Sequence, residues 1–222
     1  MKHASELIKG FESEQYNELL TDIYVDEHLL AYQNGRYIAA LQKFIKDFGD
    51  TEVSIFSAPG RSEVGGNHTD HQHGQVLAAS INLDAIAIVA KTSDDKIQVI
   101  SDGYDLITID ASDLSLVESE KETTTALIKG VAAGLKEHGH AVGGFKAYIT
   151  SDVLIGAGLS SSAAFETIIG TILSGLYNNG SVSAIEIAII GQYAENVYFG
   201  KPCGLMDQMA SSVGNLVHID FA

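Results

Sequence analysis

The stretch Val153-Leu154-Ile155-Gly156-Ala157-Gly158-Leu159-Ser160-Ser161-Ser162-Ala163-Ala164 determines how the rest of the chain is interpreted. An extended apolar run, residues 145–149, precedes it, and a long helical pattern follows it. Two glycines and three consecutive serines therefore stand between a strand and a helix. Glycines let a backbone approach an anion, and the N–H groups and dipole at a helix start favour negative charge there.

Several kinds of site share these parts. The serine hydroxyls can cap the helix, bind phosphate oxygens or ligate Mg²⁺. The stretch lacks the Gly-Lys-Ser/Thr of a Walker loop and the third glycine of the dinucleotide-binding fingerprint. A phosphate loop of another kind and a plain serine-capped turn both remain open on this evidence alone.

Composition and charge narrow the class of protein. The chain has 222 residues, of which 45% are hydrophobic and 19% charged, and no apolar run reaches the roughly 20 residues that span a bilayer. The polar start and the single cysteine, Cys203, favour a cytoplasmic protein. The net charge of −16 argues against nucleic acid and anionic membranes as partners. An anionic ligand would have to be bound by a few local groups, such as backbone N–H groups, a metal ion or single cationic side chains. The chain has only two arginines, Arg36 and Arg61.

Hydrophobic periodicity predicts the elements along the chain. Helices are expected over 4–20, over 26–48 with an interruption at Asn34-Gly35, over 123–138, over 161–177 and from 183 to about 199. Strands are expected over 52–58, 76–81, 85–91, 97–101, 106–109, 143–152 and 216–221, with a polar surface loop at 111–122. Helices, then strands, then a mixture of both favour an α+β fold over a doubly wound sheet.

A second unusual stretch, residues 57–74, contains four glycines, three histidines, one arginine and two acids. Such a polar, glycine-rich segment is expected to form a loop at the end of a strand. It could be a solvated loop, a metal site or a site for a small polar ligand. The metal site would use His68, Asp70, His71 and His73, although the zinc signature His-Glu-x-x-His is absent. In the third interpretation Asn67, His68 and Asp70 grip hydroxyl groups and Arg61 neutralises a phosphoryl group.

The third stretch, residues 200–214, brackets a short helical turn between a proline and glycines and carries one acid, Asp207. On its own, Asp207 could simply be a carboxylate that stabilises the first turn of a helix.

Taken together, the three motifs resemble the GHMP small-molecule kinases, with galactokinase-type members as the nearest pattern. The motifs are Pro59-Gly60-Arg61 with Gly66-Asn67-His68-Thr69-Asp70, then residues 156–163, then Cys203-Gly204-Leu205-Met206-Asp207-Gln208. The resemblance implies a GHMP-kinase N-terminal domain (ribosomal protein S5 domain 2-like), in which a mixed sheet packs against helices. That domain is expected over residues 51–222, preceded by a helical segment at 1–50, and the family's C-terminal domain has no match here. We therefore expect the 222 residues alone to turn over sugar very poorly.

The resemblance also implies an activity and site residues. The reaction would be ATP-dependent and Mg²⁺-dependent phosphorylation of a monosaccharide, with galactose giving galactose 1-phosphate. Asp207 would act as base on the anomeric hydroxyl, while Arg61 would stabilise the phosphoryl group and hold Asp207 ionised. The other implied contacts are Asn67, His68, Asp70 and Gly204 to the sugar, Gly156, Gly158, Ser160 and Ser161 to the ATP phosphates, and Ser162 and Glu195 to Mg²⁺.

The sequence departs from the family pattern in the sugar motif. The family usually has Asn where Glu63 stands and Glu where Asn67 stands, tyrosine at His71 and often proline at Leu154. We hypothesise that Glu63 partly replaces the missing acid in binding sugar. Two alternatives stay open: a non-catalytic sugar or ATP sensor on the same fold, and a related GHMP kinase for arabinose or an N-acetylated sugar. A metal-dependent hydrolase that uses the histidines is the fourth and least favoured interpretation.

Overall fold

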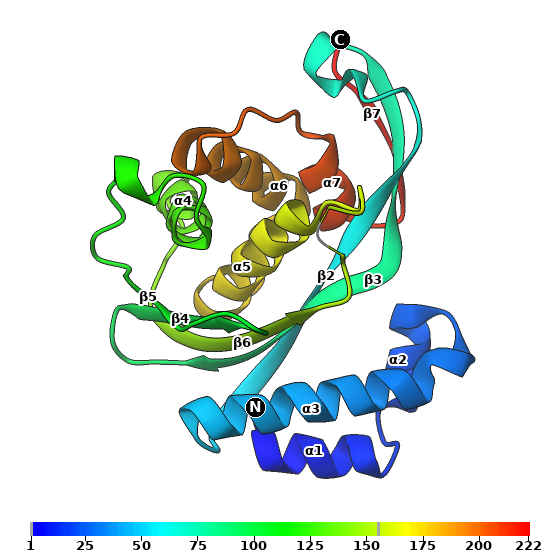
Figure 1. Ribbon diagram of the computed structural model, residues 1–222, viewed down its shortest axis with the longest axis vertical. Helices are drawn as coiled ribbons and strands as arrows, with labels where there is room; N and C mark the ends of the chain where they lie inside the picture. Colours follow the sequence, from blue (N-terminus) through cyan, green and yellow to red (C-terminus); the bar gives the residue numbers. More distant parts are fainter. Residues whose placement is uncertain (1, 155) are drawn as a thin grey trace.

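The structure, a computed structural model, describes residues 2–154 and 156–222. One sheet separates two groups of helices (Figure 1). Helices α1 (Ala4–Glu12), α2 (Asn17–Tyr24) and α3 (Leu30–Phe48) lie on one face, and α4 (Thr124–Glu137), α5 (Ser161–Tyr177), α6 (Ala184–Tyr193) and α7 (Met206–Val213) lie on the other. The layers bury an apolar face of each element against a neighbour, as an α+β domain must.

Among the described residues the sheet has seven strands, paired in the order β1-β2-β3-β6-β4-β5, with β7 pairing separately with β3. They are β1 (Lys2–His3), β2 (Glu52–Gly65), β3 (Gln75–Lys91), β4 (Lys96–Ser101), β5 (Ile107–Asp110), β6 (Phe145–Ser151) and β7 (Leu216–Asp220). The pair β4–β6 is parallel and the other pairs are antiparallel. The expected mixed sheet packed against helices is therefore confirmed.

Strands β2 and β3 are longer than the sequence pattern predicts. The loop expected at 57–74 is wrong for residues 57–65, which continue β2, and only 66–74 form a turn with the 3₁₀ segment η2 (Thr69–Gln72). The strands expected at 76–81 and 85–91 are one strand. The register of the β2–β3 pair shifts between Pro59 and Arg61 and again between Glu63 and Gly65. These bulges let the polar, glycine-rich segment bend while it stays in the ladder.

The N-terminal helices also differ from the prediction. The helix expected over 4–20 is broken, because Glu14 has a left-handed backbone (φ 59°) between α1 and α2. Leu19, expected on the apolar face, is exposed. The next helix does begin at an Asp26 cap, through the 3₁₀ turn η1 (Glu27–Leu29). It is not interrupted at Asn34-Gly35, because α3 continues to Phe48. The side-chain amide of Asn34 donates to the Leu30 carbonyl at 3.0 Å, one turn earlier in the same helix.

Two cores flank the sheet, and β3 supplies both. Ala87 and Val89 pack toward α4, α5 and α6, while Ile86 and Ile88 pack toward α1, α2 and α3. Alternation of side chains along a strand explains this division. A third, smaller cluster joins Val76 and Ala78 of β3 to Met206 and Ala210 of α7, which holds α7 against the end of the sheet beside β7 (Figure 1).

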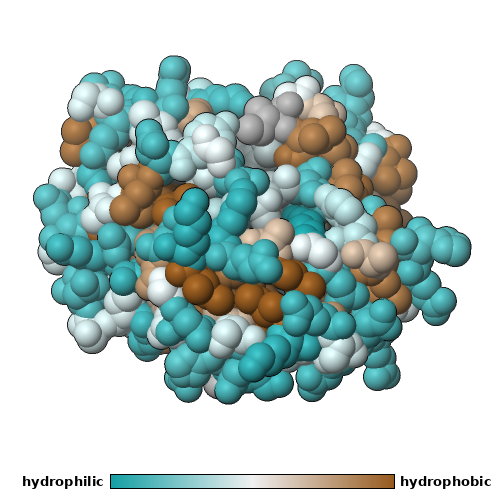
Figure 2. Space-filling view, turned by 60° about the horizontal axis from the view of Figure 1, so that its bottom comes forward, coloured by the Kyte–Doolittle hydropathy of each residue, from teal (hydrophilic) through white to brown (hydrophobic). Residues whose placement is uncertain are grey.

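The remaining surface is mostly polar. Figure 2 looks toward the face that carries the N-terminal helices, and hydrophilic residues cover most of it, with hydrophobic residues in a short band below the centre and in groups at the upper right and at the left. None of the helices in the described ranges combines the length and the apolar character needed to span a bilayer.

Candidate active site

The centre of the site is an ion pair between Arg61 and Asp207. Arg61 follows the first bulge of β2, and Asp207 is the second residue of α7. Arg61 Nε donates to Asp207 Oδ1 at 2.6 Å, and Nη2 donates to Oδ2 at 2.8 Å. The Arg61 side chain is 7% exposed and that of Asp207 is 28% exposed. The paired geometry fixes both groups, while the carboxylate remains open to a ligand.

The glycine–serine loop, residues 153–160, closes onto this pair. The Arg61 amide donates to the Leu159 carbonyl at 3.1 Å, and its Nη1 donates to the Gly158 carbonyl at 2.5 Å. The Ser160 hydroxyl donates to Asp207 Oδ2. The three sequence motifs, which are separated by as many as 146 positions, therefore meet at one place.

The loop backbone suits an anion. Gly156 (φ 75°), Gly158 (φ 73°) and Ser160 (φ 59°) are left-handed, and a Cβ added at either glycine would have nothing within 4 Å. Glycine is needed there for its backbone conformation and not to make room for a neighbour. Ser161 begins α5, a helix of 17 residues, whose first N–H groups have no acceptor within the helix. Residues Gly156, Gly158, Ser160 and Ser161 thus fit a phosphate group; Ile155 of the same motif lies outside the described residues.

Ser162 and Glu195 form the second part of the site. The Ser162 hydroxyl lies 3.4 Å from Glu195 Oε1. Glu195 is buried in the π-helical segment η4 (Ala194–Phe199), which continues α6. Hydroxyl and carboxylate oxygens are ligands that Mg²⁺ accepts. The residues predicted to hold Mg²⁺ therefore lie together and have suitable chemistry.

The sequence did not indicate the groups that support Glu195. The Gln208 amide donates to Glu195 Oε2 at 2.9 Å and to Glu166 Oε2 at 3.0 Å. The Lys201 ammonium lies 3.8 Å from Glu195 Oε1. Gln208 directly follows Asp207 on α7, so the same helix carries the Asp207 carboxylate and holds the Glu195 carboxylate. The position of Gln208 next to Asp207 was the only available signal, and it says nothing about which element the side chain meets.

Glu166 is a buried acid, and among the described residues no salt bridge joins it to a cation. Burial raises the pKa of Glu166 well above its ordinary value, and the nearby Glu195 raises it further. The folded protein therefore holds this proton more tightly than the unfolded chain, whose glutamate releases it above about pH 4.5, so this residue makes folding less favourable as the pH rises above that value. We expect Glu166→Gln to raise the Tm at pH 8 more than at pH 5. Parallel Tm profiles for the two proteins over that range would contradict this expectation.

Asp70 and Gly204, both predicted to contact sugar, lie against each other. Asp70 Oδ2 accepts from the Met206 amide at 3.3 Å, and the Asp70 side chain is only 7% exposed. A Cβ added at Gly204 would lie 1.9 Å from Asp70 Oδ2. Gly204 therefore makes room for the carboxylate.

We expect Gly204→Ala to destabilise the domain by about 1–3 kcal/mol, because Asp70 and its partners must move. Gly35→Ala is the matched control: Gly35 lies in α3 with nothing within 4 Å of an added Cβ, so alanine should stabilise by about 0.5–1 kcal/mol. Urea unfolding measures both changes, and equal effects from the two substitutions would show that the space beside Asp70 is unimportant.

His68 lies between Glu63 and the ion pair. Glu63 Oε1 accepts from the His68 amide at 2.9 Å, and Oε2 accepts from the ring Nδ1. The other ring nitrogen, Nε2, lies 3.5 Å from Arg61 Nη2 and 3.9 Å from Asp207 Oδ1. The hydrogen bond from the His68 amide lowers the pKa of Glu63. Asn67 is exposed in the adjacent turn, and among the described residues no hydrogen bond joins its side chain to the ion pair.

The histidines do not gather around a metal position. The rings of His68 and His71 turn to Glu63 and Asp70, and His73 Nδ1 donates to the Phe221 carbonyl at 3.2 Å. Within residues 2–154 and 156–222 no group of three or more His, Cys, Asp or Glu side chains could hold a metal ion. The alternative of a histidine metal site is therefore not supported.

Comparison with known proteins tests the family. A family model described as the N-terminal domain of GHMP kinases matches residues 126–215, and the galactokinase galactose-binding signature matches residues 42–91. Residues 126–215 therefore carry the N-terminal domain of the GHMP kinases. The matched ranges contain the three motifs, so the family resemblance seen in the sequence is confirmed.

Among GHMP kinases, similar curated proteins are galactokinases. That of Lactococcus lactis is 34% identical over 191 residues, and that of Clostridium tetani is 31% identical over 188 residues. Each alignment covers 84% of this chain but only 48% and 47% of the relatives, so the chain spans about half the length of the curated relatives it matches.

Solved structures agree with the GHMP kinase fold. The crystal structure of Lactococcus lactis galactokinase complexed with galactose superposes with a TM-score of 0.76 at 32% identity, covering 83% of this chain and 49% of that one. Mevalonate kinase from Methanococcus jannaschii, at 19% identity, has a TM-score of 0.64, with coverage of 77% and 54%. The second likeness supports the fold alone.

Proposed function

We propose that this chain is the N-terminal part of a kinase that transfers the γ-phosphoryl group of ATP to the anomeric hydroxyl of a monosaccharide, with galactose as the expected sugar. The observation that carries the proposal is the paired Arg61–Asp207 contact at the end of the glycine–serine loop. The galactokinase relatives, one of them solved with galactose, support this choice of substrate.

Each part of the site has a role in this reaction. The Asp207 carboxylate accepts the proton of the sugar hydroxyl as its oxygen attacks the γ-phosphorus and the bond to the β-phosphate oxygen breaks. The Arg61 guanidinium neutralises the charge on the transferring group. Such reactions depend mostly on positioning and charge neutralisation, and these two groups are already oriented by each other.

The nucleotide would lie on the loop and the start of α5, with Gly156, Gly158, Ser160 and Ser161 around its phosphates. Ser162 and Glu195 would hold Mg²⁺, whose charge offsets that of the phosphate oxygens. Backbone N–H groups and a few cations would bind the phosphates locally, which suits a chain whose net charge of −16 would otherwise repel them.

The sugar would contact Asn67, His68, Asp70 and the backbone at Gly204, with Glu63 acting beside them. Because both Glu63 oxygens accept from His68, the acid can orient the histidine as well as contact a hydroxyl. We expect Glu63→Gln to weaken galactose binding roughly 10–100-fold, since a hydrogen bond to a charged group contributes about 1.5–3 kcal/mol. Unchanged galactose affinity by titration calorimetry would remove Glu63 from the sugar site.

The organisation of the chain is part of the proposal. Residues 1–50 form a helical segment that packs on a domain formed by 51–222, and the whole protein has a second half like that of its relatives. A cytoplasmic location is consistent with the single cysteine.

The test is ADP release from Mg-ATP across a panel of sugars, using this chain and the chain extended to the length of its relatives. We expect galactose-dependent release from the extended chain and very little from the 222 residues alone. Release with arabinose or an N-acetylated sugar instead would identify a different GHMP sugar kinase. Binding of sugar and nucleotide without ADP release would favour the sensor interpretation and overturn the proposed activity.

A further inference from the structure

The two arginines of the chain lie at the two ends of the glycine–serine loop. Arg61 holds the far end through the carbonyl groups of Gly158 and Leu159. Arg36, on α3 at the opposite face of the sheet, reaches the near end: its Nη1 lies 3.2 Å from Oδ2 of Asp152, the residue just before the loop. The Arg36 side chain is only 6% exposed, so this contact is shielded from solvent and insensitive to salt.

Asp152 is held at three points. Besides Arg36 at Oδ2, the Tyr32 hydroxyl of α3 donates to Oδ1 at 2.9 Å. The Asp152 amide donates to the Asp84 carbonyl at 2.9 Å. Two of the three contacts come from α3, so the N-terminal helices help to fix the start of the loop beside the pairing of β6 with β3.

Asp84, on β3, fixes Arg36 in turn. Arg36 Nη1 donates to Asp84 Oδ1 at 2.6 Å, and Nη2 donates to the Asp84 carbonyl at 2.7 Å. The hydroxyls of Tyr24 and Ser57 donate to Asp84 Oδ2 at 2.9 Å and 2.5 Å. Polar groups from α2, α3, β2 and β3 thus converge on one buried carboxylate, which gives Arg36 a single orientation.

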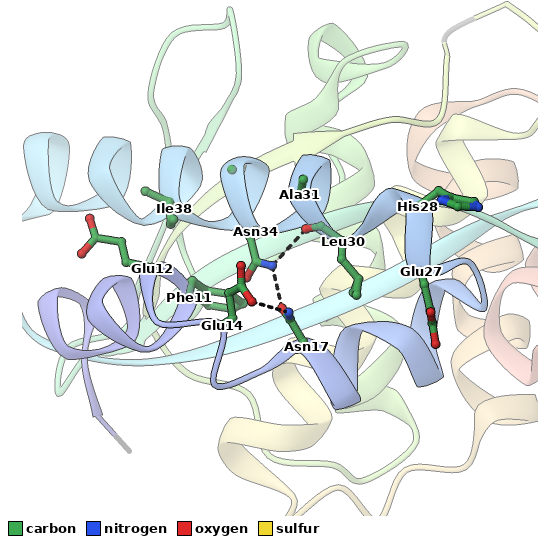
Figure 3. Close-up of a pocket in the computed structure, with 11 residues that line it drawn as sticks. Phe11, Glu12, Glu14, Asn17, Glu27, His28, Leu30, Ala31, Asn34 and Ile38 are labelled. Carbon is green, nitrogen blue, oxygen red and sulfur yellow. Dashed lines mark hydrogen bonds between the residues drawn. The ribbon is translucent and has the colours of Figure 1, made fainter.

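The helix that carries Arg36 is itself braced. The Asn34 amide of α3 donates to Asn17 Oδ1 of α2 at 2.8 Å. Figure 3 shows this contact inside a groove of about 530 Å³ between α1, α2 and α3. None of the residues that line this groove is among the predicted site residues, and the Asn34–Asn17 hydrogen bond in it joins α3 to α2. We interpret it as part of the brace.

The described middle of the loop is open to solvent. Its glycines have open space around an added Cβ, and Leu154 is 64% exposed, whereas Val153 at the near end is buried. Ordering each loop residue costs about 1–2 kcal/mol of backbone entropy. A loop whose ends are already fixed loses less freedom when it closes on a ligand.

We propose that Arg36 and Tyr32 are positioning residues for the nucleotide, because they fix the start of the phosphate loop through Asp152 from the other side of the sheet. Most of the segment that supplies them, residues 1–41, precedes both ranges that match the family models. The nature of the ligand, a nucleoside triphosphate with Mg²⁺, rests on the proposed function. The anchoring itself rests on the contacts above.

Tyr32→Phe and Asp152→Asn test the proposal in the chain extended to the length of its relatives. Each variant removes one contact from a partly exposed residue. The readouts are the affinity for a fluorescent ATP analogue with Mg²⁺, the affinity for galactose, and hydrogen exchange of the peptide that contains residues 150–163. Tyr104→Phe, in the exposed turn between β4 and β5, is the matched control.

We expect both variants to bind the nucleotide roughly 3–10-fold more weakly, the range for one hydrogen bond, and to exchange faster over 150–163. Galactose affinity should stay close to that of the parent and of Tyr104→Phe for both variants, and so should the Tm of Tyr32→Phe. Unchanged exchange together with unchanged nucleotide affinity would overturn the proposal, as would an equal loss of galactose affinity, which indicates general loosening. Faster exchange in a chain whose parent binds no nucleotide would support the anchoring and count against the proposed function.

Discussion

Asp207→Asn is expected to lower sugar turnover about 10²–10⁴-fold, the usual contribution of a general base, while galactose still binds. Asparagine keeps the size of the side chain and one acceptor oxygen for Arg61, but it cannot take a proton from the sugar hydroxyl. The loss should therefore fall on kcat, with a smaller change in KM. The Ser160 hydroxyl, which donates to the same carboxylate, can still donate to the amide oxygen, so the loop should remain closed on α7.

Turnover is measured in the chain extended to the length of its relatives, and galactose affinity is measured separately by calorimetry. Asp220→Asn is a suitable control, because Asp220 is an exposed carboxylate on β7 that pairs with Gln75. A kcat for Asp207→Asn within a few fold of that control would remove Asp207 from the chemistry. Loss of galactose binding would instead indicate that the substitution disturbs the site as a whole.

Asp84→Asn should produce the largest loss of stability. Removing one partner of a buried ion pair leaves the other charge uncompensated, which costs about 3–5 kcal/mol. We expect about 3 kcal/mol here, at the low end, because Arg36 keeps Asp152 within 3.2 Å. The asparagine amide must also turn a donor toward Arg36 or toward the Tyr24 and Ser57 hydroxyls, which breaks at least one further hydrogen bond.

Urea unfolding of the two proteins measures the difference. Asp102→Asn is the control, because Asp102 also forms an ion pair, with Lys43 at 2.5 Å, but both side chains are about half exposed. Solvent screening makes such surface pairs weak, so that variant should stay close to the parent. Similar losses from the two substitutions would mean that burial does not distinguish the pairs.

Local sequence signals predicted the helices on the site side of the sheet well. Thr123 and Ser183 cap α4 and α6 with their own side chains, and the predicted span of α5, residues 161–177, is the span observed. The long strands were not predicted: β2 was expected to give way to a loop because residues 57–74 are polar and rich in glycine, and β3 was expected as two strands. Whether such residues end a strand or bulge within it depends on the partner strand, which local sequence does not reveal.

As with the fold, part of the candidate site was predicted and part was not. Spacing and resemblance indicated that the segments around Arg61, Ser160 and Asp207 belong together, and the structure places them in contact. The hydrogen bonds that Gln208 donates to Glu195 and Glu166 were not predicted. They depend on how α6 packs against α7, and the sequence of a helix does not show which helix packs against it. The same limit concealed Arg36, which lies 116 positions from Asp152 in the sequence and meets it only once α3 covers the sheet.

The sharing of β3 between the layers also bears on how the chain reaches its native state. One end of β3, residues 75–79, pairs with β7, about 140 positions later, while the other end pairs with β6, and β2 pairs along residues 77–89. Contacts between such distant segments form slowly, because a long loop must close first. During synthesis, Val76 and Ala78 stay exposed until α7 and β7 have left the ribosome. The nascent sheet therefore presents an unpaired apolar edge while residues 92–215 are being synthesised, and this is where we expect chaperones to bind.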